Sequence, residues 1–543
     1  MRSRTFIALV TVALALTGSA RSQAPAAKRA TPPLRPIFFV TGHGWGHGIG
    51  LSQYGALGYA QHGFTYDKIL AHYYPGTTLG QAPLARVRVL LAASRRQVTV
   101  SDESTFLVKD GVGKSHKLAA GSYSFGNGFK LKLSASKPAQ ALPGPLLFQP
   151  GVQPLSLGGV PYRGAFQVAR VGAALQVVNA VGLDLYVMGV VPREMPKEWP
   201  SDALKAQAIA ARSYALAHLK RGVDFDLYSD TRSQVYGGIR AESPSSNLAV
   251  SATSGRVVLY QGKVADTMFS STSGGRTAAV QDVWPAAKPV PYLISVPDPY
   301  DSISPYHNWG PLRFSPALLG RKLGLHGPLV DVQAAFNPSG RVRSLTASGD
   351  RTQVTLTGQN ARRALGLRSN WFRVGVINLG APSAPAVFGA QVRLNGVARG
   401  VSTLTLQQRP YAGTWHTVSP LKPGADGTLA FPVRPKVSSD YRLVADKVEG
   451  RPVHVAVAPL VGFYPVTDRV SLRGHVRPII AGASVLIQRM GATDWATVTR
   501  TTVDQAGDFA ASFNLTHGTY RARVPPFNGY VFGTSQVLKV LPA

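Results

Sequence analysis

Glu194 is the side chain in this sequence best placed to act as a general acid. It lies between Pro192 and Pro196, just ahead of a run with helical periodicity, and proline cannot continue a helix from its interior. We therefore predict that Glu194 lies on a rigid loop, where burial would raise the pKa of its carboxyl group. Such an acid can protonate the bridging oxygen of a glycosidic bond. Glu198 competes, but it lies nearer the helix start, whose dipole favours the charged form. The alternative for Glu194 is an exposed glutamate in a proline-rich turn.

Residues 42–56, GHGWGHGIGLSQYGA, form a second unusual segment. Its glycines let the backbone approach another surface closely. His43 and His47 have the spacing of two metal ligands on a helix, but the surrounding glycines disfavour a helix here. We expect the two imidazoles, Gln53 and Tyr54 to bind a sugar or to brace the loop that carries the glutamate. Metal binding and a tight structural loop are the alternatives.

A helix predicted over residues 201–219 must position the glutamate. Ser201 or Asp202 can cap its first turn, and Gly222 ends it. Apolar residues recur on one face at helical spacing, which predicts a buried stripe. Three polar residues of this helix are expected to contact the substrate or to orient the acid, with ordinary packing as the alternative: Gln207, Arg212 and Tyr214.

Two polar, turn-like segments further on are typical of the rim of a cleft that binds a hydroxyl-rich ligand. The first contains Gln234 and Tyr236, and the second contains Ser271, Ser273 and Gly274. We expect these five residues to contact the substrate. A serine nucleophile is disfavoured, because no recognisable base accompanies these serines in a nucleophile elbow.

The composition indicates a secreted protein held together by apolar cores. The chain has 543 residues, 45% of them hydrophobic, and no cysteine, which excludes thiol catalysis and thiolate metal sites. Residues 1–24 are typical of a signal peptide, because Arg2 and Arg4 precede an apolar run that ends in small residues. An uncleaved anchor is the alternative. Residues 25–36 are predicted to form a flexible leader, and no later segment is long and apolar enough to form a stable membrane span.

The charge of the chain predicts a polyanionic partner outside the cell. The formal net charge is +32, and residues 381–543 alone contain 17 basic and 8 acidic residues. Anionic polymers of a cell wall are the expected partner, and we expect the protein to be secreted and wall-associated. Nucleic-acid binding is not expected, since neither a clustered basic patch nor a known module is found. Solubility alone is the remaining explanation.

The pattern of expected strands, helices and repeats along the sequence predicts an α+β protein in three parts. Residues 37–380 are expected to form a mixed, β-rich catalytic domain with a central helix. An internal repeat follows with an offset near 80 residues: LQQR at 406–409 matches LIQR at 486–489, and Trp415 matches Trp495. We therefore predict two small β-sandwich (Ig-like) modules, residues 384–460 and 461–543, each with one buried tryptophan.

Many segments together resemble the SpoIID/LytB family, named for stage II sporulation protein D and an amidase enhancer. The resemblance covers residues 37–374. The segments that carry it include GVVPREMP at 189–196, ALKAQA at 203–208, ARSYA at 211–215, SQVY at 233–236, STSGGRT at 271–277 and the glycine-rich segment 42–56. Two departures stand out. The glycine-rich segment precedes the glutamate segment, whereas in the sporulation proteins it usually follows it. The stretch 226–234 lacks the Cys and His that bind zinc in some members.

The resemblance implies a peptidoglycan lytic transglycosylase that prefers strands stripped of stem peptides, with Glu194 as its single acid and base. Such an enzyme cleaves the bond between N-acetylmuramic acid and N-acetylglucosamine and leaves a 1,6-anhydro end. No cofactor is implied. The family names also imply the alternative, a non-catalytic glycan-binding protein that stimulates a cell-wall amidase. They suggest a role in sporulation, with growth and division as alternatives.

Overall fold

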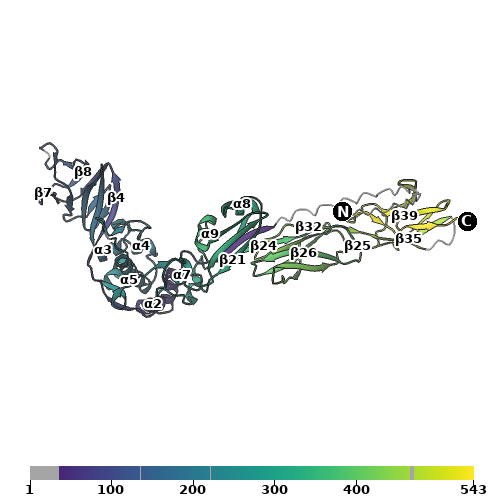
Figure 1. Ribbon diagram of the computed structural model, residues 1–543, viewed down its shortest axis with the longest axis horizontal. Coiled ribbons are helices and arrows are strands. Elements are labelled where there is room, and N and C mark those ends of the chain that lie inside the picture. Colours follow the sequence, from purple (N-terminus) through teal and green to yellow (C-terminus); the bar gives the residue numbers. More distant parts are fainter. Residues whose placement is uncertain (1–35, 135, 221, 465–469, 543) are drawn as a thin grey trace, which may run out of the picture.

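The computed structural model describes residues 36–134, 136–220, 222–464 and 470–542. The predicted signal peptide, and the predicted leader up to residue 35, lie outside the described residues. The molecule is elongated and bent (Figure 1). A β-unit lies at one end, a group of helices lies at the bend, and β-structure follows in line to the C-terminus. Strands greatly outnumber helices, so the prediction of a β-rich chain is confirmed.

The β-unit at the end of the molecule far from the C-terminus contains two sheets. The larger has the order β16-β4-β15-β14-β11-β6-β7, with β16 (Leu227–Tyr228), β4 (Arg86–Arg95), β15 (Ala174–Gly182), β14 (Ala165–Val171), β11 (Leu146–Gln149), β6 (Phe106–Lys109) and β7 (Ser115–Leu118). The smaller has the order β13-β12-β5-β8, with β13 (Val160–Tyr162), β12 (Leu155–Leu157), β5 (Gln97–Asp102) and β8 (Gly121–Gly126). Alternating side chains of both sheets, Val100 and Phe166 among them, enclose one apolar core.

Helices gather around α5 (Ser201–Ala217) at the bend (Figure 1). Twelve residues of α5 are buried, many of them alanines, whose small side chains let neighbouring elements pack closely. The neighbours are α1 (Gln53–Gln61), α2 (Tyr66–Tyr73), α3 (Leu183–Met188), α4 (Val191–Glu194) and α6 (Pro244–Ala252).

Both predicted ends of α5 are wrong in detail. Pro200 occupies the N-cap position and no side chain caps the helix; the carboxylate of Asp202 instead accepts a hydrogen bond from the backbone N–H of Tyr66 at 3.2 Å. The helix ends at Ala217, well before Gly222. Proline is tolerated just before a helix because the first amides need no partner within it.

One sheet crosses the predicted boundary between residues 380 and 384. Its order is β20-β1-β24-β26-β29, with β1 (Ile37–His43), β20 (Asn308–Phe314), β24 (Phe372–Leu379), β26 (Val392–Arg399) and β29 (Thr428–Val433). Side chains alternate across β1: Phe38 and Val40 lie in the core beneath α8 (Pro316–Lys322) and α9 (Gly358–Leu365), whereas Phe39 lies in the core of the first module. The first module therefore shares its sheet and its core with the N-terminal strand.

The tandem repeat forms two modules with matching strands. In the first, β27 (Leu404–Pro410) lies between β28 (His416–Pro420) and β30 (Ser439–Ala445). In the second, β36 (Ser484–Met490) lies between β37 (Trp495–Thr502) and β39 (Gly518–Val524). A second sheet of this module has the order β34 (Leu460–Phe463), β35 (Ser471–Arg477) and β38 (Asp508–Ser512), and its side chains share the module's core.

The prediction of a buried tryptophan in each module is wrong. Trp415 and Trp495 are partly exposed, and each stacks against an arginine, Arg442 at 4.2 Å and Arg521 at 4.3 Å. A Trp–Arg stack covers part of the ring, and Arg442 also pairs with Glu449 at 2.7 Å.

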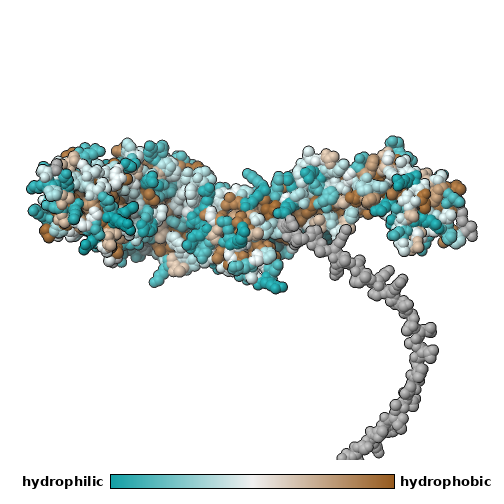
Figure 2. Space-filling view, turned by 90° about the horizontal axis from the view of Figure 1, so that it is seen from above, coloured by the Kyte–Doolittle hydropathy of each residue, from teal (hydrophilic) through white to brown (hydrophobic). Residues whose placement is uncertain are grey.

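The surface is mostly polar. In the view of Figure 2, hydrophobic residues are scattered among hydrophilic ones along the length of the molecule. Among the described residues, no helix combines the length and apolar character needed to cross a bilayer.

Candidate functional site

The helix α4 places Glu194. The glutamate is the last residue of this one-turn helix, which begins at Val191 with Pro192 in its first turn, and the chain becomes extended at Met195. The prediction that Glu194 lies on a loop is therefore wrong, since it lies in a short helix. A proline is tolerated in the first turn because its missing N–H would have no partner there. Val191 and Met195 are buried on either side, so the short helix is fixed to the core.

Burial raises the pKa of the Glu194 carboxyl group. Two donors partly oppose this shift: the side-chain amide of Gln53, whose Nε2 lies 3.5 Å from Oε2, and the backbone N–H of Val235. The side chain remains partly exposed, so a ligand can reach it. A raised pKa and a reachable carboxyl group are the two properties that a general acid needs.

The glycine-rich segment reaches Glu194 through the start of α1. Ser52 caps this helix by accepting a hydrogen bond from the N–H of Gly55, and Gln53 is its first residue. Tyr54 stacks edge-on against Trp199 with ring centroids 5.0 Å apart, and both rings are partly exposed. The fold thus joins two segments that are far apart in the sequence, although their order along the chain differs from that of the sporulation proteins.

His47 fastens the glycine-rich segment. Its Nδ1 accepts a hydrogen bond from the N–H of Ile49 at 3.0 Å, and the ring also bonds the backbone of Phe269. Burial lowers its pKa to about 4, so the ring is neutral at physiological pH. Because the ring is held by backbone groups on both sides, it has no nitrogen left for a metal or a sugar. The segment needs glycine at Gly48, since a Cβ there would collide with the guanidinium of Arg341.

His43 lies apart from His47. Its ring packs on Trp371 with centroids 4.9 Å apart and bonds the side chain of Asn308, and burial lowers its pKa. The two histidines of the motif are therefore not a pair of ligands. In the described part of the chain no group of three His, Asp or Glu side chains could hold a metal ion.

The three polar residues of α5 lie in different surroundings. Arg212 is fully buried, and its guanidinium pairs with Asp184 at 2.7 Å and donates to the carbonyl of Arg256. It joins α5 to neighbouring elements and has no surface to offer a glycan, which corrects the expected substrate contact. Gln207 is also fully buried, and no partner is found among the described residues for its amide atoms. Tyr214 is partly exposed, and burial together with the charges of Asp266 and Glu194 raises its pKa.

Gln234 and Tyr236 lie behind Glu194 rather than on a rim. Gln234 accepts a hydrogen bond from the hydroxyl of Tyr186 at 3.2 Å, and Tyr236 donates one to Asn179 at 3.0 Å. Both side chains are at most 5% exposed, so they support the site from within. The prediction that they contact the substrate directly is corrected for this reason.

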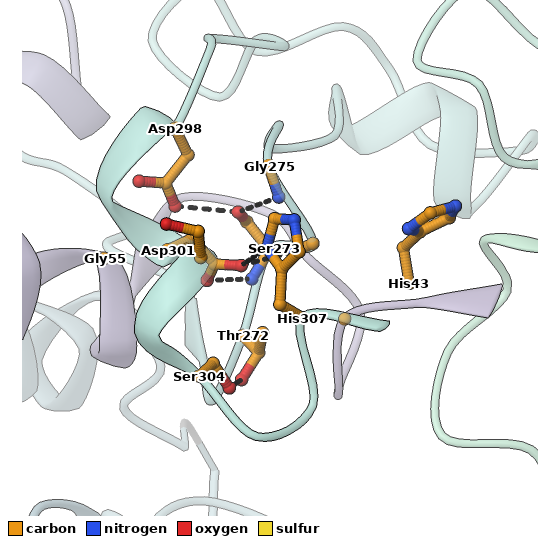
Figure 3. A network of polar contacts seen from close by, with 12 residues as sticks. His43, Gly55, Thr272, Ser273, Gly275, Asp298, Asp301, Ser304 and His307 are labelled. Carbon is orange, nitrogen blue, oxygen red and sulfur yellow. Dashed lines mark hydrogen bonds and ion pairs between the residues drawn. The ribbon is translucent and has the colours of Figure 1, made fainter. Parts of the chain in front are cut away.

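A buried polar network joins Ser273 to Asp298 and Asp301 (Figure 3), and the backbone of Gly274 belongs to it as well. The hydroxyl of Ser273 donates to Asp298 at 2.7 Å, and the backbone N–H groups of Ser273 and Gly274 each donate to Asp301 at 2.9 Å. Neither side chain nor backbone here faces a ligand, because both residues are buried. Only Ser271 of the three predicted residues in this segment is partly exposed; its carbonyl accepts from the N–H of Tyr54.

Asp298, Asp301 and His307 were not found by reasoning from the sequence. Both aspartates are fully buried, and Nδ1 of His307 is hydrogen-bonded to Oδ2 of Asp301 at 2.9 Å. Asp301 also accepts from Ser52, the residue before Gln53, so the network supports the start of α1. The available signal was two aspartates three residues apart in a proline-containing turn, VPDPYD, with a histidine shortly after.

Comparison with known proteins finds relatives of the segment that contains Glu194. The family model described as "Stage II sporulation protein" (SpoIID) matches residues 172–260, which include α3 to α6 and Glu194. A stage II sporulation protein D of Bacillus amyloliquefaciens is 34% identical over 221 residues, which cover 36% of this chain and 62% of that protein.

Two further relatives match shorter segments. An amidase enhancer of Bacillus subtilis is 42% identical over 113 residues, 21% of this chain and 15% of that protein. An uncharacterized protein of Brachyspira hyodysenteriae is 39% identical over 141 residues, 25% of this chain and 38% of that protein. The chain thus spans less than two thirds of the length of each of these relatives.

Proposed function

Because this chain belongs to the SpoIID family, we propose that it is a secreted lytic transglycosylase that cleaves the glycan strands of peptidoglycan. Glu194 is the acid. It protonates the oxygen between N-acetylmuramic acid and N-acetylglucosamine, and the carboxylate so formed takes the proton from the C6 hydroxyl of the muramic residue. That oxygen closes on C1 and leaves a 1,6-anhydro end.

The surroundings of Glu194 carry this proposal. Its carboxyl group has a raised pKa, remains partly exposed, and accepts hydrogen bonds from Gln53 and from the backbone N–H of Val235. In the described part of the chain, no second carboxylate is among the groups that shift its pKa. Hydrolysis by an ordinary glycosidase uses two carboxyl groups, at about 5–5.5 Å or 6.5–9.5 Å from each other. A single acid suits ring closure, because the substrate supplies its own nucleophile.

The pH dependence follows from the sign of the shift. Glu194 must begin the reaction protonated, and burial raises the pKa at which it loses that proton. The rate should therefore fall as the pH rises through this raised pKa, at a higher pH than for an exposed glutamate.

The proposal is tested with Glu194→Gln. Denuded glycan strands are incubated with each protein, and anhydro-muramic ends are counted by mass spectrometry. We expect the variant to lose about 10²–10⁴-fold in rate, the usual contribution of acid–base catalysis. Glu198→Gln is the matched control, because Glu198 is an exposed glutamate four residues away. Equal rates for Glu194→Gln and the wild type would reject the assignment of Glu194 as the acid. Absence of product from the wild type would reject the proposal that the protein is an enzyme.

The similarity to an amidase enhancer supports a second candidate. In this function the protein binds glycan and stimulates a cell-wall amidase without cleaving the strand. Adding the Glu194→Gln variant to an amidase separates the two functions. Full stimulation of the amidase, with no anhydro ends from the wild type, would favour the second candidate.

We further propose that the two modules hold the protein on anionic wall polymers. Each carries the same Arg–Trp stack, and in each the arginine Nε also donates to a glutamine, Gln407 at 2.9 Å and Gln488 at 2.7 Å. Because the first module shares a sheet with β1, removing it would expose the core around Phe39, so substitution is the better test. Replacing both stacked arginines with alanine should weaken sedimentation with cell walls, most strongly at low salt; unchanged sedimentation would reject the role.

A further inference from the structure

A cavity of about 700 Å³ lies between strand β21 (Leu329–Phe336) and strand β24, well separated in sequence from Glu194. Its lining combines two aromatic side chains, two arginines and one glutamine. These are Phe336, Trp371, Arg373, Arg399 and Gln333. Cavities of this size that mix aromatic surface with a few polar groups are typical of ligand sites.

The arginines give the cavity an excess of positive charge. Arg399 pairs with Asp331, whose carboxylate also accepts from the N–H of Val332 and from Gln333. The guanidinium of Arg373 has no ion pair among the described residues, and its residue is exposed. Of the two guanidinium groups, that of Arg373 is therefore the one available to an anionic ligand.

The aromatic surface is held in place. Phe336 is 46% exposed, an unusual exposure for a phenylalanine. Trp371 packs against His43, with ring centroids 4.9 Å apart, and the guanidinium of the buried Arg341 lies 4.9 Å from its ring. These contacts hold Trp371 in the wall of the cavity, and Phe336 is the more exposed of the two rings.

We propose that this cavity is a second glycan-binding site, which takes a sugar ring that bears a carboxylate. The exposed ring of Phe336 matches the apolar face of a pyranose, Gln333 matches its hydroxyls, and the guanidinium of Arg373 matches the carboxylate. Trp371 also accepts a backbone hydrogen bond from His43, where the glycine-rich segment begins, so a strand held here lies beside the segment that contacts Glu194. The inference deepens the proposed function and rests on it for the class of substrate.

The test measures binding rather than cleavage. Denuded glycan fragments are titrated by calorimetry into the Glu194→Gln protein, which does not consume them, and into the same protein with Arg373→Ala or Phe336→Ala. We expect each additional change to raise Kd about tenfold or more. Two controls remove exposed side chains from the same strands outside the cavity: Arg393→Ala on β26 and Val330→Ala on β21. These should leave Kd within about twofold of the parent.

The chemistry of the ligand is tested with two further probes. Fragments whose carboxylates are converted to methylamides should bind about as weakly to the parent as the unmodified fragments bind to Arg373→Ala. Polygalacturonate tests whether the carboxylate can come from another wall polysaccharide, and tight binding that depends on Arg373 would assign the site to that source as well.

Three results would overturn the site: equal Kd values for Arg373→Ala and Arg393→Ala, equal binding of capped and uncapped fragments, or unchanged binding by Phe336→Ala. The melting temperature of each variant confirms that it is folded. Failure here is distinguishable from failure of the proposed function, because anhydro ends made by the wild type depend on Glu194 and not on this binding.

Discussion

Glu194 and the pair Asp298–Asp301 are both removed from water, but the protein surrounds them differently. Asp301 accepts hydrogen bonds from Ser52, from two backbone N–H groups and from His307, and both aspartates are completely buried. Glu194 has two donors, one of them at 3.5 Å, and stays partly exposed. The carboxylate of Asp301 joins several segments of the chain through its hydrogen bonds. Glu194 is left with a carboxyl group that can exchange a proton.

The comparison also shows that a raised pKa alone does not identify an acid catalyst. Burial and the charge of Asp301 raise the pKa of Asp298 to about 7, yet no ligand can reach that carboxyl group. Burial raises the pKa of Glu194 too, and there the side chain is accessible. Accessibility therefore separates the functional acid from the structural one.

The largest expected effect on stability is that of Asp301→Ala. The substitution leaves buried donors of Ser52, Ser273 and Gly274 without their acceptor, and each such donor costs about 1–3 kcal/mol. We expect the free energy of unfolding to fall by at least about 3 kcal/mol in urea titrations. Glu194→Gln should lower it by less than about 1 kcal/mol, since few donors depend on that carboxylate. Equal losses in the two variants would break the distinction between the sites.

Asp298→Asn should change how stability depends on pH. The carboxyl group has a pKa of 3.8 when unfolded and about 7 when folded, so it contributes stability below pH 3.8 that is lost as the pH rises to about 7. The stability of the wild type relative to Asp298→Asn should therefore decline across this range, by a few kcal/mol in order of magnitude. Thermal melts of both proteins at a series of pH values measure this difference. A constant difference from pH 4 to pH 7 would contradict the raised pKa.

Gln53→Met should produce the smallest change and sharpen the role of the second segment. The amide of Gln53 lowers the pKa of Glu194, so its loss should raise that pKa and move the alkaline fall in rate to higher pH. The rate on the plateau should change by about two- to tenfold, the equivalent of one hydrogen bond. Tyr54→Phe is the matched control, because it keeps the stack on Trp199 and leaves the amide in place. Superimposable pH profiles for Gln53→Met and the wild type would remove Gln53 from the site.

The sequence allowed the short, fixed element that carries Glu194 to be predicted, because its signals are local. Two prolines confine Glu194 to a short element, and burial of such an element follows from the apolar residues beside it. The helix α5 and the repeat of the two modules were predictable for the same reason, since periodicity and repetition can be read along the chain. Cap positions and helix ends were wrong by a few residues.

Long-range pairing could not be read from local signals. Nothing in the sequence near Asp301 shows that the hydroxyl of Ser52, some 250 residues earlier, will donate a hydrogen bond to its carboxylate. The alternation of β1 is visible in the sequence, but not that Phe39 will enter a module more than 340 residues away. Arg212 and Tyr236 looked like substrate contacts because polar residues usually lie at the surface, whereas here buried partners satisfy them.

The central claim is that burial raises the pKa of the Glu194 carboxyl group, and carbon-13 NMR of the side-chain carboxyl groups tests it directly. The chain has five glutamates, Glu103, Glu194, Glu198, Glu242 and Glu449, so protein labelled at the glutamate Cδ gives few signals to follow against pH. We expect one signal to titrate above the ordinary value of 4.5 and to be absent from Glu194→Gln. If the signal lost in that variant titrated at or below 4.5, Glu194 would be an ordinary carboxylate and the account of the site would be contradicted.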